Sequence, residues 1–302
     1  MPFDSDDLRS KLVTSPPPHA APDYSGMSYG RFWQLPPVEA EPGHDTWWAR
    51  GQNFVLGYSD VHGTAVFERA DEPQEHVLVL CDEGLSAVIE GPGGDRVEAP
   101  GRSLVILPPG GTVATVRGTG RAFRLIRSTA ADLVAKCVNA ADYAEDHLNI
   151  PPFQAWPDPV GGFRIRVYDL TVPPLSKPPF RLFRCTTFMV NYIDPIEGPR
   201  SLHNLSPHYH DDFEQCSLAI AGQYVHHIRW PWTTDRAVWR EDEHELCGSP
   251  SVAIIPPPSI HTSEAVDAGS NHLIDIFSPP RVDFSAQEGW VLNAADYPAP
   301  AS

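Results

Sequence analysis

The sequence predicts an all-β protein built from two similar barrels or sandwiches, and three observations support this fold class. The 302-residue chain contains 33 prolines, about twice the usual share, and proline is excluded from helix interiors and central strands. Apolar residues make up 41% of the chain, and they gather in short runs between Gly- and Pro-rich turns. Similar landmarks also occur in the same order in both halves of the chain, which indicates a duplication.

The short apolar runs predict the individual strands. In the first half they are residues 54–58, 76–80, 85–89, 103–107 and 123–127, with a hairpin turn at residues 91–95. In the second half they are residues 163–170, 184–192, 216–221, 223–230, 252–255 and 272–277. Residues 130–138 form the one fair helical stretch, placed where a linker between two domains would lie.

The duplication rests on three landmarks. The segment VNAADY at residues 138–143 returns as LNAADY at residues 292–297. A Pro-Pro pair that ends a strand occurs at Pro108 and again at Pro256, and a strand-ending glycine occurs at Gly84 and Gly222. We therefore expect a flexible Pro-rich arm at residues 1–30, an N-terminal barrel at 31–130, a linker with a short helix at 131–160 and a C-terminal barrel at 161–297. The alternative is one large β domain whose hairpins resemble each other.

Charge and cysteine content exclude several classes of protein. The formal net charge of −17 disfavours a nucleic-acid partner, because the field repels phosphates. The five cysteines include no CxxC pair, which favours reduced thiols over a disulfide framework. The acidic N-terminus does not resemble a signal peptide, and no apolar run is long enough to span a membrane. We expect a cytoplasmic protein without a membrane partner.

A histidine constellation in the second half indicates a metal site. His208 and His210 stand two residues apart, so on a strand their imidazoles point to the same face. Glu214 follows four residues later and can return a carboxylate to that face, and His261 lies at a strand-to-turn boundary farther on. Three imidazoles and one carboxylate suit Fe, Mn, Ni, Co or Zn and leave one or two coordination positions open.

This constellation resembles the metal motifs of the cupin superfamily. The first cupin motif runs His-x-His, three or four residues, Glu, and a strand-ending Gly, and here His208, His210, Glu214 and Gly222 fill those places. The second motif is matched at Pro256 and His261, and the sequence departs from it at Pro258 and Ala265. The resemblance implies two cupin-type jelly-roll β-barrels in one chain, a bicupin. It also implies one divalent transition metal per chain, with iron favoured over Mn, Ni, Co or Zn.

The first half lacks a comparable motif. Where His-x-His would stand, residues 69–74 read RADEPQ, and after the turn at residues 108–111 comes Thr112 with no histidine. His76 stands alone and is expected to be a packed or surface residue. The sequence therefore predicts one metal site, in the C-terminal barrel, and a structural or dimerisation role for the N-terminal barrel.

Other polar and aromatic side chains of the second half are candidate substrate contacts. They are His226, Arg229, Trp230 and Tyr192, of which Arg229 and Trp230 begin a long tryptophan-rich hairpin. Packing roles are the competing interpretation for each of them. Cys216, two residues after Glu214, is expected to be a small core residue.

These features predict a mononuclear metal-dependent enzyme that acts on a small oxygenated organic substrate. The resemblance implies oxidoreductase, lyase and isomerase chemistries, of which Fe(II)-type dioxygenase chemistry is favoured because of the tryptophan-rich hairpin. One alternative is a lyase or isomerase in which Glu214 acts as the base. Others are a non-catalytic cupin that binds a small ligand and a structural protein with a lapsed site. No nucleophile elbow, Walker loop or dinucleotide fingerprint is present. We expect a homodimer or a higher homo-oligomer.

Overall fold

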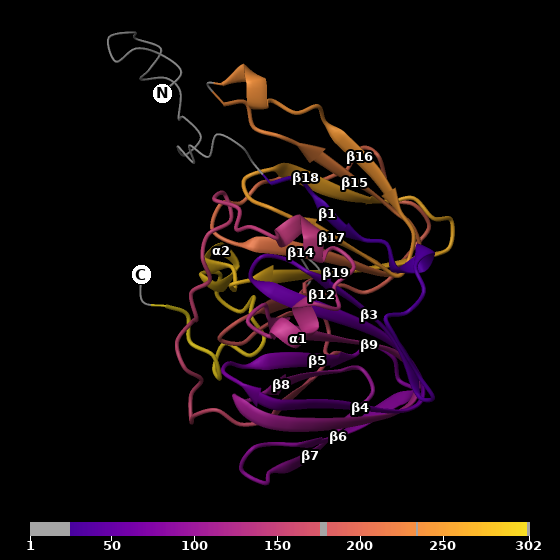
Figure 1. Ribbon diagram of the computed structural model, residues 1–302, viewed down its shortest axis with the longest axis vertical. Coiled ribbons are helices and arrows are strands. Elements are labelled where there is room, and N and C mark those ends of the chain that lie inside the picture. Colours follow the sequence, from indigo (N-terminus) through magenta and orange to yellow (C-terminus); the bar gives the residue numbers. More distant parts are fainter. Residues whose placement is uncertain (1–24, 176–179, 234, 301–302) are drawn as a thin grey trace.

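Two β-barrels stacked along the long axis make up the molecule (Figure 1). The computed structural model describes residues 25–175, 180–233 and 235–300. The N-terminal barrel lies at the bottom of the view in purple tones, and the C-terminal barrel lies above it in orange and yellow. This arrangement is the all-β fold of two cupin-type jelly rolls that the sequence predicts.

One continuous antiparallel sheet forms the N-terminal barrel. Its strands are β2 (Glu39–Glu41), β3 (His44–Arg50), β4 (Phe54–Glu72), β5 (His76–Leu80), β6 (Leu85–Glu90), β7 (Arg96–Pro100), β8 (Ser103–Leu107), β9 (Gly110–Arg127) and, beside β8, β10 (Arg166–Asp169). The long strands β4 and β9 pair along most of their length, and both β5 and β6 pair with β9. At Gly118 the φ angle is +117° and a Cβ would lie 1.9 Å from the Gly84 carbonyl oxygen, so only glycine fits this close approach of two strands.

Two sheets form the C-terminal barrel. The larger contains β11 (Leu182–Arg184), β12 (Met189–Tyr192), β14 (Glu214–Ala221), β17 (Ser251–Ile255) and β19 (Ser270–Ser278), with the short β13 (Ile196–Glu197) beside β19. The smaller contains β15 (Tyr224–Arg229), β16 (Glu243–Cys247) and β18 (Ile260–Ala265), in the order β16-β15-β18. Tyr224 and Ala265 of the smaller sheet pack on Ala219 of the larger. The space between these two sheets is the interior of the C-terminal barrel.

The two barrels exchange edge strands, which shifts the boundaries expected from the sequence. Strand β1 (Ser28–Gly30) pairs with β17 of the C-terminal barrel, so these residues of the expected arm belong to a sheet. Strand β10 (Arg166–Asp169), expected to open the C-terminal barrel, instead pairs with β8 of the N-terminal barrel. Residues 1–24, where the rest of the expected arm falls, lie outside the described residues.

The largest apolar cluster lies between the barrels. Strands β5 and β9 contribute Val77, Val79, Phe123 and Leu125, and strands β14 and β19 contribute Cys216, Leu218, Ile274 and Ile276. Strand β5 is buried along its whole length, and β14 in all but its last residue, as expected for strands covered on both faces. Because side chains alternate along a strand, the residues between these face the barrel interiors. On β14 the interior residues include Gln215, Ser217 and Ala219.

The repeated NAADY segment has the same role in both halves. The Asn139 side chain accepts a hydrogen bond from the Arg50 backbone N–H (2.9 Å) and donates one to the Arg50 carbonyl (2.8 Å). The Asn293 side chain makes the same two bonds to Arg184, at 3.0 and 2.8 Å. Each asparagine therefore hydrogen-bonds the backbone of the last residue of a strand, Arg50 of β3 or Arg184 of β11. The two segments occupy equivalent places, which supports the inferred duplication.

Helical structure is sparse. The described helices are α1 (Ala131–Val134) and α2 (Val282–Ser285), with the 3-10 turns η2 (Phe32–Gln34), η3 (Ala140–Tyr143) and η4 (Arg236–Val238). The α-helix expected at residues 130–138 is thus only one turn long. Within the described part of the chain, no helix has the length and apolar character needed to cross a membrane. All five cysteines are buried free thiols.

Candidate metal centre

Three histidines meet at one end of the C-terminal barrel. The ring centroids of His208 and His261 lie 4.5 Å apart, and those of His210 and His261 lie 5.0 Å apart. Reciprocal backbone hydrogen bonds of 3.1 and 2.8 Å join His208 to His261 and hold the two chain segments in register. The structure therefore brings together the three imidazoles that the sequence singled out.

Hydrogen bonds and burial leave ring nitrogens with free lone pairs. His208 and His261 each have Nδ1 at 3.0 Å from a backbone carbonyl two residues earlier, Ser206 and Ser259 respectively. A carbonyl only accepts, so in the neutral form of His208 the proton lies on Nδ1 and Nε2 keeps a lone pair, which is the tautomer found in metal-binding histidines. In His261 both ring nitrogens face acceptor oxygens, those of Ser259 and Gln215, and a neutral ring donates to only one of them. Both ring nitrogens of the buried His210 have no hydrogen-bond partner. Burial lowers the pKa of His261 to about 3 and that of His210 well below its usual range, so both are neutral.

Gln215 completes this arrangement with a fourth donor atom. Its Oε1 lies 3.2 Å from His261 Nε2. Its amide nitrogen faces the other way, 3.2 Å from Ser217 Oγ and 3.3 Å from Asp275 Oδ1. Because neutral His261 has one N–H for two acceptor oxygens, one of its two contacts joins two acceptors, and with the proton on Nδ1 it is the contact between Nε2 and Gln215 Oε1. Ligands in neighbouring positions around a transition metal, each about 2.1 Å from it, lie about 3 Å apart, so a cation fits this convergence.

The structure does not bring Glu214 to the imidazoles. Its two carboxylate oxygens each accept a hydrogen bond of 2.8 Å from the N-terminal barrel, from the backbone N–H groups of Gln52 and Asn53. Glu214 and Gln215 are neighbours on β14, so their side chains point to opposite faces of the strand. Complete burial raises the pKa of Glu214 to about 7 although the two N–H groups favour its charged form. The expected fourth ligand therefore joins the barrels instead.

Glu75 occupies the corresponding place in the N-terminal barrel, immediately before β5. Its carboxylate accepts hydrogen bonds from the backbone N–H (3.0 Å) and hydroxyl (2.8 Å) of Thr186 and from the Tyr297 hydroxyl (2.8 Å). Each barrel thus contributes one glutamate that binds a loop of the other barrel: Glu214 binds the loop after β3, and Glu75 binds the loop after β11. The loop sequences RGQNF (50–54) and RCTTF (184–188) are a repeat signal that marks this exchange.

The N-terminal barrel holds other residues at the positions of the metal donors. Arg69 pairs with Thr112 in the register in which His208 pairs with His261. Arg69 forms ion pairs with Glu72 and Asp132, at 2.5 and 2.6 Å. His76, next to Glu75 as Gln215 is next to Glu214, is buried with Nε2 at 3.1 Å from Thr112 Oγ1. A guanidinium and a hydroxyl thus stand where the C-terminal barrel has two imidazoles.

Histidine, cysteine and carboxylate side chains do not by themselves form a metal site here. Among the residues that the structure describes, no group of three or more of these side chains is arranged to hold a metal ion. The fit of a metal rests on the unpartnered nitrogens of His210 and on the convergence of His261 with the Gln215 oxygen. The full ligand set therefore stays a prediction.

The four candidate substrate contacts have different environments. His226 is buried beside β18 with Nδ1 at 2.9 Å from Ser263 Oγ, and its Nε2 has no partner. Arg229 is exposed and pairs with Asp242 at 2.6 Å. Trp230 is buried and donates to Glu243 at 2.8 Å. Tyr192 lies in the core between the barrels, with its hydroxyl 3.1 Å from the Cys81 carbonyl, so it does not face the histidines.

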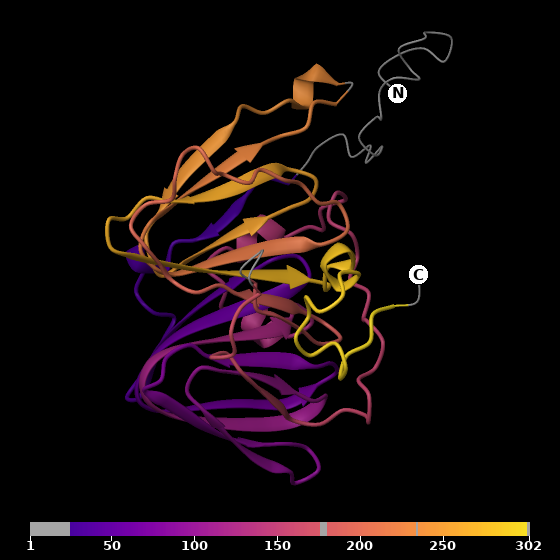
Figure 2. The same cartoon turned by 180° about the vertical axis from the view of Figure 1, so that it is seen from behind.

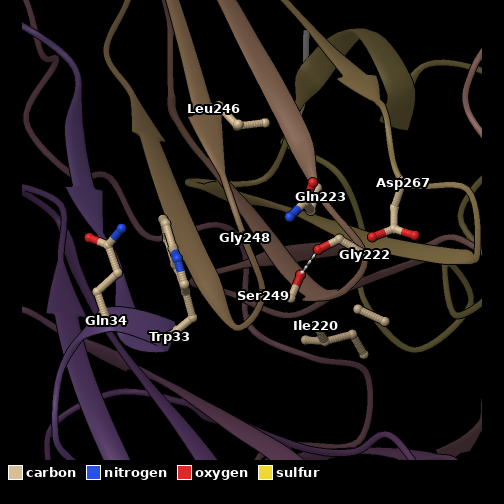
Figure 3. A pocket seen from close by; sticks show the side chains of 10 residues that line it. Trp33, Gln34, Ile220, Gly222, Gln223, Leu246, Gly248, Ser249 and Asp267 are labelled. Atoms are coloured by element: carbon tan, nitrogen blue, oxygen red, sulfur yellow. Dashed lines mark hydrogen bonds between the residues drawn. The ribbon is translucent and has the colours of Figure 1, made fainter.

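Two of the hollows that the described residues form open on the C-terminal barrel, near opposite ends of β15. The smaller, of about 160 Å³, reaches His261 and is bordered by Pro207, Arg229 and Ile260. The larger, of about 480 Å³, is lined by Trp33, Gly222, Gln223 and Ser249 (Figure 3). It lies at the β14–β15 turn, whereas the histidines lie where β14 begins, so it contains none of the candidate metal ligands. Seen from behind, the β15–β16 hairpin, in orange, projects above the C-terminal barrel (Figure 2).

Comparison with known proteins supports the fold. No family model matches the sequence, and no curated protein matches it. Solved structures that are similar include AerE from Microcystis aeruginosa, with a TM-score of 0.54 and 11% identity over 82% of this chain and 98% of that one. An oxalate decarboxylase gives a TM-score of 0.55 and 13% identity over 92% and 87% of the two chains. The oxalate decarboxylase of Lactobacillus farciminis gives 0.52 and 11% over 86% and 88%. At these identities the likeness shows the fold alone.

Proposed function

We propose that the chain is a mononuclear metal-dependent cupin enzyme that acts on a small oxygenated organic substrate. The observation that carries this proposal is the convergence of three imidazoles and the Gln215 oxygen, with His208 Nδ1 and His261 Nδ1 each 3.0 Å from a backbone carbonyl and His261 Nε2 3.2 Å from Gln215 Oε1. His208, His210, His261 and Gln215 would hold one divalent metal. A bound metal supplies Lewis acidity and, for iron, redox chemistry.

The donor set favours an anionic substrate. Imidazoles that ligate a metal are neutral, and an amide oxygen is uncharged, so the charge of a divalent metal held by these groups would remain available to an oxygen anion. The unpartnered Nε2 of His226, on the strand beside His261, is available to hydrogen-bond such a ligand. Exposed Arg229 borders the hollow that includes His261, but Arg229 pairs with Ile260 whereas Ile228 pairs with His261, so the Arg229 side chain lies on the opposite face of the sheet from that imidazole.

Fe(II)-type dioxygenase chemistry is the reaction that we propose first. A decarboxylating lyase is a second candidate, because solved structures with a similar fold are named oxalate decarboxylases. The lyase or isomerase in which Glu214 is the base loses its support, because that carboxylate binds backbone N–H groups of the other barrel. A role as a non-catalytic ligand-binding protein is the remaining alternative.

A paired gas assay tests the function. Protein loaded with Fe(II) or Mn(II) is mixed with catechols, β-diketones, flavonols and small hydroxy or keto acids while oxygen uptake and CO2 release are recorded. We expect turnover that is lost in His261→Ala. Oxygen uptake identifies a dioxygenase, and CO2 release without net oxygen uptake identifies a lyase. A fully loaded protein that binds these compounds and turns over none of them contradicts the enzyme assignment.

A further inference from the structure

Asp275 is a charged residue inside the C-terminal barrel for which no sequence motif predicts a role. It lies in the middle of β19, between Ile274 and Ile276, which face the core between the barrels. The Asp275 side chain therefore points into the barrel interior, toward Ser217 on the neighbouring strand. It is enclosed by protein and only partly accessible to water.

Hydrogen bonds tie Asp275 to the candidate metal centre. Its Oδ1 accepts from Ser217 Oγ at 2.7 Å and from Gln215 Nε2 at 3.3 Å. These acceptors hold the Gln215 amide nitrogen on their side, so the amide oxygen must face His261. Rotating the amide by 180° would place its oxygen against the carboxylate, an arrangement of two acceptors without a proton between them.

The N-terminal barrel carries the opposite charge at the same position. Ser217 lies three residues after Glu214 and pairs with Asp275 across the ladder, and Leu78 lies three residues after Glu75 and pairs with Arg124. Arg124 is buried between the rings of Trp48 and Phe67, with its Nε and Nη2 lacking hydrogen-bond partners. The barrel without metal donors thus has a built-in cation where the barrel with the imidazoles has an anion.

We propose that Asp275 is a positioning residue for the metal centre, which orients the Gln215 oxygen toward the imidazoles and supplies a negative charge that the uncharged ligands lack. This inference rests on the proposed function, because it presupposes a metal at the three histidines. Removing an outer partner of a metal ligand typically weakens metal affinity about 10- to 100-fold. A charge inside a barrel of low dielectric acts strongly on a nearby cation.

Metal titration tests the role of Asp275 without relying on activity. Apo protein is titrated with Co(II) and with Mn(II) in competition with a chromogenic chelator, and the Co(II) absorption spectrum is recorded. We expect Asp275→Asn to bind both metals at least about 10-fold more weakly and to change the Co(II) spectrum. Ser217→Ala, a milder change to the same contact, should weaken binding by a smaller factor in the same direction.

Two further variants separate positioning from general destabilisation. Arg124→Met removes the charge at the equivalent position of the other barrel and should leave metal affinity unchanged. Gln215→Glu, added to Asp275→Asn, puts a negative charge directly on the ligand and should restore most of the lost affinity. Thermal unfolding of each apo protein verifies that the variants are folded.

The outcomes distinguish this inference from the proposed function. A wild-type protein that binds neither metal overturns the proposed function and the inference with it. A wild-type protein that binds metal while Asp275→Asn and Ser217→Ala bind it equally well overturns the inference alone. The inference also fails if Arg124→Met weakens binding as much as Asp275→Asn, or if Gln215→Glu restores nothing.

Discussion

The motif predicts the Glu214 carboxylate as the fourth ligand, but the oxygen that lies beside His261 belongs to the next residue, Gln215. The cupin motif allows three or four residues between the second histidine and the glutamate, which here correspond to Glu214 and Gln215. Successive side chains on β14 point to opposite faces, so a shift of one residue exchanges the core between the barrels for the barrel interior. The sequence locates the three histidines, but which neighbour faces them depends on where the strand begins.

Glu214 is predicted to stabilise the contact between the barrels and not the metal. Replacing it by Gln leaves a single acceptor oxygen for two buried N–H groups and brings an amide nitrogen against one of them. We expect Glu214→Gln to lower the free energy of unfolding by about 1–3 kcal/mol, measured by urea denaturation at pH 8, and to leave metal content unchanged.

Glu75→Gln is the matched control for this change. It alters the equivalent contact from the barrel without metal donors, so its effect on stability should be similar. Loss of metal in Glu214→Gln but not in Glu75→Gln would show that Glu214 is a ligand after all.

Most individual strands follow from the sequence, because apolar β-branched runs between turns define them. Strands β5 and β8 coincide with the runs at residues 76–80 and 103–107. Strand β1 was not predicted, because a three-residue edge strand has no periodic pattern. The first half of β9 was also missed, since its Gly-, Thr- and Arg-rich residues gain their conformation from pairing with β4. The exchange of β1 and β10 could not be predicted, because no local sequence pattern shows which barrel an edge strand pairs with.

The repeated asparagines give a test of the duplication at the level of elements. Asn139→Ala and Asn293→Ala each remove two hydrogen bonds to the backbone of an arginine that ends a strand. We expect each variant to lose about 2–4 kcal/mol of unfolding free energy, because buried backbone groups are left without partners. Denaturant unfolding measures both effects. A large loss in one variant and none in the other would contradict the equivalence of the two segments.

At the scale of the whole molecule, several buried histidines make the stability depend on pH. Burial lowers the pKa of His76 to about 3 and that of His272 to about 4, below the ordinary value of 6.5. Folding therefore favours the neutral form of both side chains. Their full contribution to stability is present above about pH 6.5, and it is lost as the pH falls from there toward the lowered values.

His76 provides a measurable case far from the candidate metal centre. At pH 5, about 1.5 pH units below the ordinary pKa, the His76 side chain is protonated in the unfolded protein and neutral in the folded one. Keeping it neutral at this pH costs about 2 kcal/mol of folding free energy. When the pH is lowered from 7.5 to 5, the free energy of unfolding of the wild type should fall. In His76→Gln this fall should be smaller by about 2 kcal/mol. The exposed His62, changed to Gln, is the control and should lose as much as the wild type. An equal loss in all three proteins would contradict this account.

The two-barrel fold and the asymmetry between its halves were predictable, because the repeat landmarks and the one-sided histidines are visible in the sequence. The roles of Gln215 and Asp275 were not, since they depend on strand pairing between β14 and β19. Tyr192 was assigned wrongly to the pocket for a related reason. The sequence does not show whether an aromatic residue on a strand near a site faces the barrel interior or the core between the two barrels, and Tyr192 faces that core.

Metal content of protein purified without a metal-binding tag tests the central claim most directly. Elemental analysis should find about one transition metal ion per wild-type chain and per Glu214→Gln chain, and almost none in the His208→Ala/His261→Ala double variant. Gln215→Ala should hold its metal more weakly than the wild type during dialysis against a chelator. Wild-type protein without metal, or a double variant that retains it, would contradict the assignment of the metal centre.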